Sequence, residues 1–224
     1  MNLAINNINN QTSHSIKHKK NQLKQEPLKG YSPIQYFQKR LIDIVMTTTL
    51  LTITLPVTLY TIYRIKKESP GPIFFTQSRI GLGGKAFTCY KFRSMHINGQ
   101  FNPYTQENDS RIFPFGNTMR KMRIDELPQL FNILKGEMHL LGPRAEWDIL
   151  VKDYENIIPH YHDRHLVRPG ITGLAQVSYP YGRNVRDAKE KLKYDLHYIK
   201  NWSLTQEIKV IFKTILVVLG KKGM

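Results

Sequence analysis

The feature that most restricts the fold is an apolar segment, residues 41–63, with basic residues at both ends. As a helix this segment would be about 34 Å long, enough to cross the hydrocarbon core of a bilayer. Three features argue against a simple crossing. Asp43 lies in the first turn, seven threonines dilute the hydrophobicity, and Pro56 interrupts the middle.

The charged flanks of the segment favour a helix that enters the membrane and returns. The flanking basic residues are Lys39, Arg40, Arg64, Lys66 and Lys67. Basic residues prefer the cytoplasmic side of a membrane, so both ends of the segment are expected at the cytoplasmic face. A helix broken at Pro56 satisfies both ends, and threonine hydroxyls are available to bond the carbonyls freed at the break. A straight helix that crosses once is the alternative.

The rest of the chain divides around this segment. Residues 1–35, rich in Asn, Gln, His and Lys, are expected to form a disordered basic tail that lies over an anionic bilayer surface. Residues 36–67 form the membrane-associated helix, and residues 68–224 form a cytosolic domain. The net charge of +16 implies an anionic partner, either nucleic acid, acidic lipid or a phosphorylated small molecule. A single cysteine, Cys89, excludes an intramolecular disulfide.

Two strand-like runs follow the apolar segment. Residues 73–80 and 85–95 are rich in β-branched and aromatic residues and surround Gly-Leu-Gly-Gly at 81–84, which predicts a β-hairpin. On the second strand Lys91 and Arg93 share a face, with Cα atoms about 7 Å apart, a spacing that suits two phosphate oxygens. The alternative is a solvated edge strand.

A helix is expected to begin at the adjacent acids Asp125 and Glu126 and to end at Gly136. Its apolar face is predicted from the spacing of Leu127, Leu130, Phe131 and Leu134. Asp is a favoured N-cap, so Asp125 could be only a cap. Glu126 favours a functional interpretation, because two neighbouring carboxylates can converge on one cation. The helix dipole would also favour the ionised form of Asp125, which a nucleophile requires.

The last third of the chain offers weaker candidates. His160, His162 and His165 resemble a metal cluster, but no cysteine accompanies them and His-x-His-x-x-His suits no common closed zinc site, so no metal is expected there. Arg168 lies in a turn-forming run and either contacts substrate or is a surface charge.

The C-terminal residues predict an amphipathic helix. Its apolar face consists of Ile208, Ile211, Phe212, Ile215 and Leu219, opposite Lys209 and Lys213. Such a helix could pack on the core or lie among lipid head groups, and the pattern favours neither.

The order of the motifs is more specific than any one of them. In chain order they are Ser-Pro-Gly-Pro at 69–72, Arg-Ile-Gly at 79–81, Tyr-Lys-Phe-Arg-Ser-Met at 90–95, Asp-Glu-Leu-Pro-Gln at 125–129, Gly-Pro-Arg at 142–144 and Arg-Pro-Gly-Ile-Thr-Gly-Leu-Ala-Gln at 168–176. From residue 36 to the end, this series resembles the bacterial sugar transferases, monotopic polyprenyl-phosphate phosphoglycosyl transferases that start exopolysaccharide, capsule or O-antigen units. The resemblance implies a mostly helical α+β fold with a re-entrant helix broken at a proline and a small antiparallel hairpin.

The resemblance also assigns roles to matching residues. Asp125 would be the nucleophile and Glu126 the Mg²⁺ ligand. The residues that would bind or position phosphates are Arg79, Lys91, Arg93, Arg120 and Arg144, with Arg168 as a further candidate. One departure is Ala145, where many members have a second proline after Gly-Pro-Arg; with Arg144 kept, only a changed turn is expected.

The implied reaction joins a UDP-sugar and a polyprenyl phosphate to give a polyprenyl-diphospho-sugar and UMP, at the inner face of the bacterial cytoplasmic membrane. Its implied partners are these substrates, Mg²⁺ and inner-membrane lipid, with a homo-oligomer left open and no nucleic acid. A basic nucleic-acid-binding module is one alternative, but it leaves the apolar segment and the paired acids unexplained. The other is a non-catalytic membrane scaffold of the same fold. The donor sugar depends on pocket contacts that spacing does not reveal.

Overall fold

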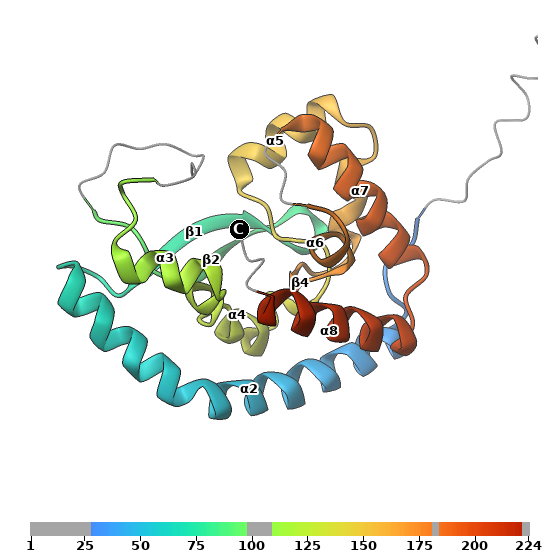
Figure 1. Ribbon diagram of the computed structural model, residues 1–224. Coiled ribbons are helices and arrows are strands. Elements are labelled where there is room, and N and C mark those ends of the chain that lie inside the picture. The colour runs from blue at the N-terminus through green and yellow to red at the C-terminus, as the bar shows by residue number, and fades with distance from the viewer. Residues whose placement is uncertain (1–27, 98–108, 181–183, 221–224) are drawn as a thin grey trace, which may run out of the picture.

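The computed structural model describes residues 28–97, 109–180 and 184–220, in which small elements gather on one side of a long helix (Figure 1). In chain order the elements are α2 (Pro33–Glu68), β1 (Phe74–Ile80), η1 (Leu82–Gly84), β2 (Ala86–Phe92), α3 (Pro114–Lys121), η2 (Ile124–Glu126), α4 (Gln129–Lys135), β3 (His139–Leu141), α5 (Asp148–Ile157), η3 (Tyr161–Leu166), β4 (Gly170–Thr172), α6 (Leu174–Ser178), α7 (Val185–Lys200) and α8 (Leu204–Leu219). Helices dominate and the strands form two small sheets, which confirms the predicted α+β class.

The helix α2 begins at Pro33, slightly before the predicted boundary. Ser32 and Gln35 form a capping box, in which each side chain accepts a hydrogen bond from the backbone N–H of the other residue. Leu28 and Tyr31 pack against the core, so the residues just before the helix are ordered by contacts. The predicted disorder of residues 1–27 lies outside the part of the chain that the structure describes.

The sequence predicts a helix broken at Pro56, whereas α2 continues through Pro56 as one bent helix (Figure 1). Proline lacks the N–H that would donate to the carbonyl of Thr52, and its ring crowds the preceding turn. The hydroxyls of Thr49, Thr52 and Thr54 donate to carbonyls four residues earlier, at distances of 2.9, 3.0 and 2.7 Å, and such bonds also bend helices. The threonine hydroxyls therefore bond carbonyls in the turns before the proline. Pro56 changes the direction of α2 without ending the helix.

Both ends of α2 are buried against the rest of the protein. Lys39, Asp43 and Thr47 are buried at a spacing of four residues in its first half, and Thr61 and Ile65 are buried in its second half. Most apolar side chains between and beside them are exposed, namely Leu41, Ile44, Val45, Ile53, Leu55, Val57, Leu59, Tyr60 and Tyr63.

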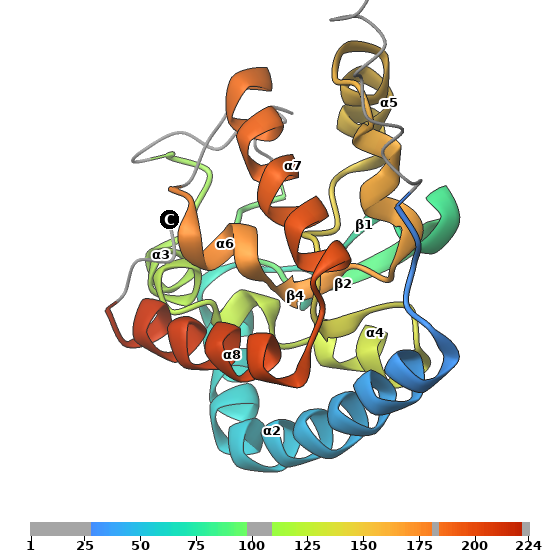
Figure 2. The same cartoon turned by 90° about the vertical axis from the view of Figure 1, so that its right-hand side faces the viewer.

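Among the described residues α2 is long and apolar enough to cross a membrane, and only 11% of its most apolar window is buried. Two views at right angles show α2 along the lower edge of the molecule, with the other elements above it (Figures 1 and 2). The exposed apolar surface of this helix is therefore continuous with one edge of the protein.

A buried polar network fixes the first half of α2. The ammonium of Lys39 donates to the carbonyl of Leu141 at 3.1 Å, to the Tyr198 hydroxyl at 2.9 Å and to Glu207 Oε1 at 2.9 Å. One helix turn later, Asp43 accepts from the backbone N–H of Leu140 at 2.8 Å and contacts the His139 ring at 2.5 Å. Asp43 is therefore satisfied inside the protein, which explains an acid in an otherwise apolar segment.

The predicted hairpin is confirmed. Strands β1 and β2 pair antiparallel from Phe74 opposite Phe92 to Ile80 opposite Ala86. The second strand ends at Phe92, earlier than the apolar pattern suggests, because the chain then turns to pair Met95 with Ile112.

A second, parallel pair of strands is not predicted by the sequence. β3 and β4 pair His139 with Gly170 and Leu141 with Thr172, in a segment whose Pro and Gly residues indicate a turn. The two chains approach so closely that a Cβ on Gly170 would lie 2.1 Å from the backbone nitrogen of Gly142. Glycine is therefore used here for close backbone contact.

Helix α8 is docked on the core and is also partly exposed. Glu207 and Val210 are buried, whereas Ile208, Phe212 and Ile215 are exposed. The helix lies near α2 in both views (Figures 1 and 2), and the ion pair of Lys39 with Glu207 joins the two helices.

Candidate active site

Asp125 and Glu126 lie in the short 3₁₀ turn η2, which corrects the predicted helix start. Helix α4 begins at Gln129. The reason is Pro128, which has no N–H to donate to the carbonyl of Ile124. The N–H of Leu127 donates to the Ile124 carbonyl at 3.1 Å instead, and this bond over three residues tightens the turn. Neither acid caps a helix through its side chain.

The end of α4 is as predicted, but its apolar face is rotated. Gly136 ends the helix with a φ of 82°, a conformation that glycine adopts without strain. Leu130 and Ile133 are buried, whereas Phe131 is 53% exposed and Leu134 is 36% exposed. Phe131 and Leu134 therefore face outward, on a helix that lies beside α2 (Figures 1 and 2).

Three cations surround the buried carboxylate of Glu126. Its Oε1 lies 2.8 Å from the Lys91 ammonium and 3.2 Å from the Arg144 guanidinium, and its Oε2 lies 3.6 Å from the Arg123 guanidinium. Burial alone would raise the pKa of Glu126, but Lys91, Arg144 and Arg123 outweigh it and hold the pKa well below its usual value. Glu126 is therefore ionised at neutral pH.

Asp125 is also buried near Lys91 and Arg123, but its pKa is shifted in the opposite direction. Desolvation raises its pKa, with a further increase from Glu126, and the opposing charges of Lys91, Arg120 and Arg123 do not fully compensate. This corrects the expectation that a helix dipole would favour ionisation. The carboxyl is poorly hydrated, and once ionised such a group is a reactive nucleophile.

Arg123 is a member of the site that is not among the predicted phosphate-binding residues. Its backbone is left-handed, with φ 58° and ψ 18°, which is uncommon for a residue with a side chain. This conformation joins α3 to η2 and turns the guanidinium towards Glu126. Adjacency to the acids is the sequence signal, and the left-handed turn is not visible in it.

Arg79 and Arg144 belong to one partly buried arrangement. Arg79 donates to the carbonyl of Ala145, next to Arg144, and to Gln77 Oε1 at 2.9 Å. Burial lowers the pKa of Arg79, and the charge of Arg144 lowers it further. Arg79 thus positions the Gly-Pro-Arg segment, and Ala145, in place of the family's second proline, is buried with its carbonyl bonded.

A second buried arginine supports Arg144 from the other side. Arg164 donates to the Arg144 carbonyl at 3.0 Å and forms an ion pair with Asp195 at 2.7 Å. This pair joins η3, α7 and the Gly-Pro-Arg segment. The sequence contains no signal for it, because the partners are 31 residues apart.

The structure does not bring Arg93 and Arg168 to the acids. Arg93 is buried and donates to the Ser69 hydroxyl and the Pro72 carbonyl, each at 2.7 Å, so it fastens the chain at the end of α2. The Arg168 guanidinium lies 4.6 Å from the centre of the Tyr36 ring, against the first half of α2. Three of the predicted phosphate-binding residues lie around the acids, namely Lys91, Arg120 and Arg144. Arg79 acts indirectly, through its bond to the carbonyl of Ala145 beside Arg144.

Comparison with known proteins agrees with the motif order. The family model described as bacterial sugar transferase matches residues 34–221. The UDP-N-acetylgalactosamine-undecaprenyl-phosphate N-acetylgalactosaminephosphotransferase of Aeromonas hydrophila is 45% identical over 194 residues, which cover 86% of this chain and 46% of that protein.

Two other relatives differ in length. The UDP-glucose:undecaprenyl-phosphate glucose-1-phosphate transferase of Xanthomonas campestris pv. campestris is 45% identical over 163 residues, 70% of this chain and 34% of that protein. The exopolysaccharide production protein PSS of Rhizobium leguminosarum bv. phaseoli is 39% identical over 187 residues, 79% of this chain and 92% of that protein. The chain spans less than half the length of the first two relatives. The family match and these identities show that the chain belongs to the bacterial sugar transferase family.

Proposed function

We propose that this protein transfers a sugar-1-phosphate from a UDP-sugar to polyprenyl phosphate, with UMP as the second product, in an early membrane step of polysaccharide synthesis. The supporting observation is a buried pair of carboxylates, Asp125 and Glu126, that is enclosed by lysine and arginine side chains. The named relatives act on UDP-sugars and undecaprenyl phosphate, and those names support the substrate classes.

The charges in the site suit a diphosphate. Four cations, Lys91, Arg120, Arg123 and Arg144, act on the two acids. The cluster therefore carries a net positive charge when both acids are ionised, and a nucleotide diphosphate would neutralise it. The same cations would withdraw charge from the phosphate oxygens, which reduces the repulsion between an anionic nucleophile and its target.

In the proposed chemistry Asp125 acts as the nucleophile. Its carboxylate oxygen attacks the β-phosphorus of the UDP-sugar, the bond from that phosphorus to the bridging oxygen breaks, and UMP departs with the bridging oxygen. An oxygen of polyprenyl phosphate then attacks the same phosphorus, and the bond to Asp125 breaks to restore the carboxylate. Two substrates thus react in turn at one site, so the kinetics should be ping-pong.

The donor set fits Mg²⁺. Two neighbouring carboxylates supply the hard oxygen ligands that Mg²⁺ takes together with substrate phosphates, and Glu126 is ionised. When bound, Mg²⁺ would neutralise charge on the transferring phosphate and on departing UMP. Glu126 would hold the ion, while Lys91 and Arg144, now 2.8 and 3.2 Å from Glu126, would turn to the phosphates.

The acceptor lipid has a route to the site. A groove lies between the second half of α2 and α3, and its lining includes Tyr60, Arg64, Phe115 and Ile124. The groove is thus lined both by the apolar helix and by Ile124, the residue directly before Asp125. A lipid phosphate could travel along it without leaving the bilayer surface, with Arg64 as a cation on the way.

The bent helix α2 is proposed to enter and leave the same membrane face. Both halves are buried against one body, at Lys39 and at Ile65, and the exposed apolar residues lie on the outer side. In this proposed arrangement the acids would face the cytoplasmic side of the inner membrane, where a nucleotide sugar is available. The exposed residues of α4 and α8 would join α2 at the lipid surface.

Replacement of Pro56 tests this topology. Pro56→Leu restores a backbone N–H for the carbonyl of Thr52, straightens α2 and should send one end across the membrane in part of the population. Single cysteines at Lys29 and Lys67, both exposed, report the two ends by labelling with a membrane-impermeant maleimide in vesicles of known orientation, since Cys89 is buried. Labelling of the two ends from opposite sides in the parent protein would refute the re-entrant arrangement.

Glu126→Gln should lower the transfer rate by about a hundredfold to a thousandfold and raise the Mg²⁺ concentration needed for half-maximal rate. The amide keeps the shape but removes the anion that balances Lys91 and Arg144. Initial rates of UMP release over a Mg²⁺ series measure both effects. Glu190→Gln, which alters an exposed pair with Lys193, is the matched control. Parental rates and Mg²⁺ dependence in Glu126→Gln would remove Glu126 from the mechanism.

The reaction class is tested by UMP release from purified protein with Mg²⁺ and polyprenyl phosphate. The donor panel contains the UDP derivatives of N-acetylgalactosamine and glucose, the sugars in the names of the first two relatives, and a wider set of UDP-sugars. Release from one donor that requires the lipid for turnover supports the proposal. No release from any donor would favour a scaffold of the same fold.

A further inference from the structure

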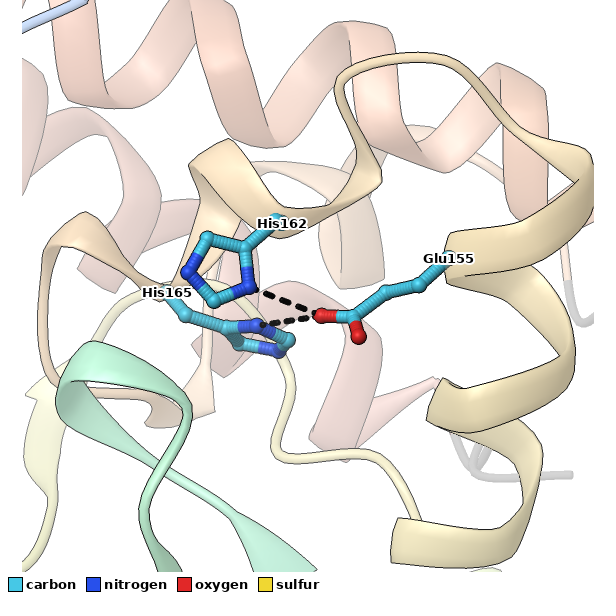
Figure 3. Close-up of side chains that lie close together, drawn as sticks. All are labelled: Glu155, His162 and His165. Atoms are coloured by element: carbon cyan, nitrogen blue, oxygen red, sulfur yellow. Dashed lines mark hydrogen bonds and ion pairs between the residues drawn. The ribbon is translucent and has the colours of Figure 1, made fainter.

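A cluster of three side chains lies away from the acids, between α5 and η3. Glu155 comes from α5, and His162 and His165 come from η3. The Nδ1 atoms of His162 and His165 lie 2.9 and 3.6 Å from the same oxygen, Oε1 of Glu155. Figure 3 shows both rings against this carboxylate, with the two contacts converging on one atom.

The cluster has a buried ring nitrogen that lacks a hydrogen-bond partner. His165 is 5% exposed, and its Nδ1 makes no hydrogen bond within the described structure, although it points at Glu155. Buried ring nitrogens are normally satisfied, so this atom calls for an explanation such as an ion.

The spacing of the three atoms suits a small transition-metal ion. Ligands about 2.0–2.1 Å from a tetrahedral zinc ion lie about 3.3 Å from one another. The two contacts with Glu155 fall on either side of that value, and all three ligand atoms lie within 4.8 Å of one another. A small adjustment of side chains would close the set around an ion.

We propose that Glu155, His162 and His165 bind a divalent transition-metal ion of the zinc class, with water in the remaining positions. Two imidazoles and one carboxylate form a borderline donor set that suits Zn²⁺ and excludes preference for Mg²⁺. The side chains of His162 and Glu155 are 61% and 35% exposed, so the ion can enter from solvent and keep bound water.

The sequence predicts no metal in this region, because the pattern considered there is the triplet of His160, His162 and His165, without Glu155. The histidine triplet suggests His160 as the third ligand, but His160 lies apart and contacts Asp163 at 3.2 Å. The third ligand, Glu155, comes from the preceding helix and has no motif that links it to the histidines. Within the described residues this is a group of three metal-binding side chains that chain spacing alone does not reveal.

An ion at this position would have a structural consequence for the proposed active site. His162 and His165 flank Arg164, which donates to the carbonyl of Arg144 and pairs with Asp195. An ion that joins α5 to η3 would therefore restrain the segment that holds Arg144. Its role would be to position that segment, and it would take no part in the transfer of the sugar phosphate.

The test uses the full chain in detergent, free of affinity-tag histidines and stripped of metal. Titration with Co²⁺ should give visible d–d absorption of the intensity that marks fewer than six ligands, and Zn²⁺ should displace it. His162→Ala and Glu155→Gln should each weaken binding of both ions at least about tenfold. Zn²⁺ should also raise the Tm of the parent protein but not that of His162→Ala.

His160→Ala is the matched control, because it removes a neighbouring exposed histidine outside the cluster, and it should bind both ions as the parent protein does. Equal affinity in the parent, His162→Ala and Glu155→Gln would overturn the proposal, as would the absence of saturable binding up to millimolar Zn²⁺. Since neither readout uses substrates, a failure here is distinct from a failure of the proposed transferase activity.

Discussion

Asp125→Asn should abolish sugar-phosphate transfer, with a loss of at least about a thousandfold in kcat, while leaving the fold and membrane association unchanged. The amide has the shape of the carboxyl and fits the same buried position, but it cannot form the acyl phosphate. Burial already raises the pKa of Asp125, so loss of its charge should cost little in stability. The measurement is UMP release in a single turnover and at steady state.

The control for Asp125→Asn is Asp153→Asn, an exposed acid on α5 that lies outside the cationic cluster. This variant should retain the parental rate, and both variants should pellet with membranes and melt near the parental Tm. Full activity in Asp125→Asn would mean that the lipid phosphate attacks the donor directly. Asp125 would then be at most a ligand or a binding residue.

Lys39→Met should lower the free energy of unfolding by about 3–5 kcal/mol, because it leaves Glu207 buried without its positive partner. The ammonium also bonds Leu141 and Tyr198, so the change removes contacts that join α2 to β3 and α7. Denaturant titration in mild detergent measures the effect. Trp202 donates to Glu207 at 2.6 Å, so its fluorescence reports on the same network.

Two variants separate the charge effect from loss of packing. Lys39→Met combined with Glu207→Gln removes both charges and should recover more than half of the lost stability. Lys66→Met, at an exposed position on the same helix, should change stability little. A single Lys39→Met within about 1 kcal/mol of the parent would show that the network does not hold α2 in place.

The hairpin and the acid pair could be predicted because their signals are local. Alternation of β-branched and aromatic residues around Gly81 predicts two strands, and adjacent acids among basic residues predict a cluster of opposite charges, to which the pair of Lys91 and Glu126 belongs. The sequence predicts that α4 begins at Asp125, because Asp is a favoured N-cap residue, but the helix begins at Gln129, after Pro128. Pro128 prevents the hydrogen bond that would have made Asp125 part of the helix.

The roles of the basic residues could not be assigned from spacing. Lys91 and Arg93 share a strand face, yet Lys91 contacts Glu126 while Arg93 turns to Ser69. Side chains this long can reach in different directions from one face, and their partners lie far away in the sequence. The same distance in the sequence hides the pairs of Lys39 with Glu207 and of Arg164 with Asp195, which hold the domain around the site.

The most direct test of the proposed mechanism is detection of the sugar-phosphoryl aspartate. The purified protein is incubated with its UDP-sugar and Mg²⁺ without polyprenyl phosphate, quenched, digested and analysed by mass spectrometry. We expect a mass increase equal to one sugar-phosphoryl group, a sugar phosphate less one water, on the peptide that contains Asp125, with a matching amount of UMP, and loss of the adduct when the lipid is added. Normal transfer to the lipid with no adduct under any quench time, and no UMP before the lipid is added, would contradict the two-step mechanism.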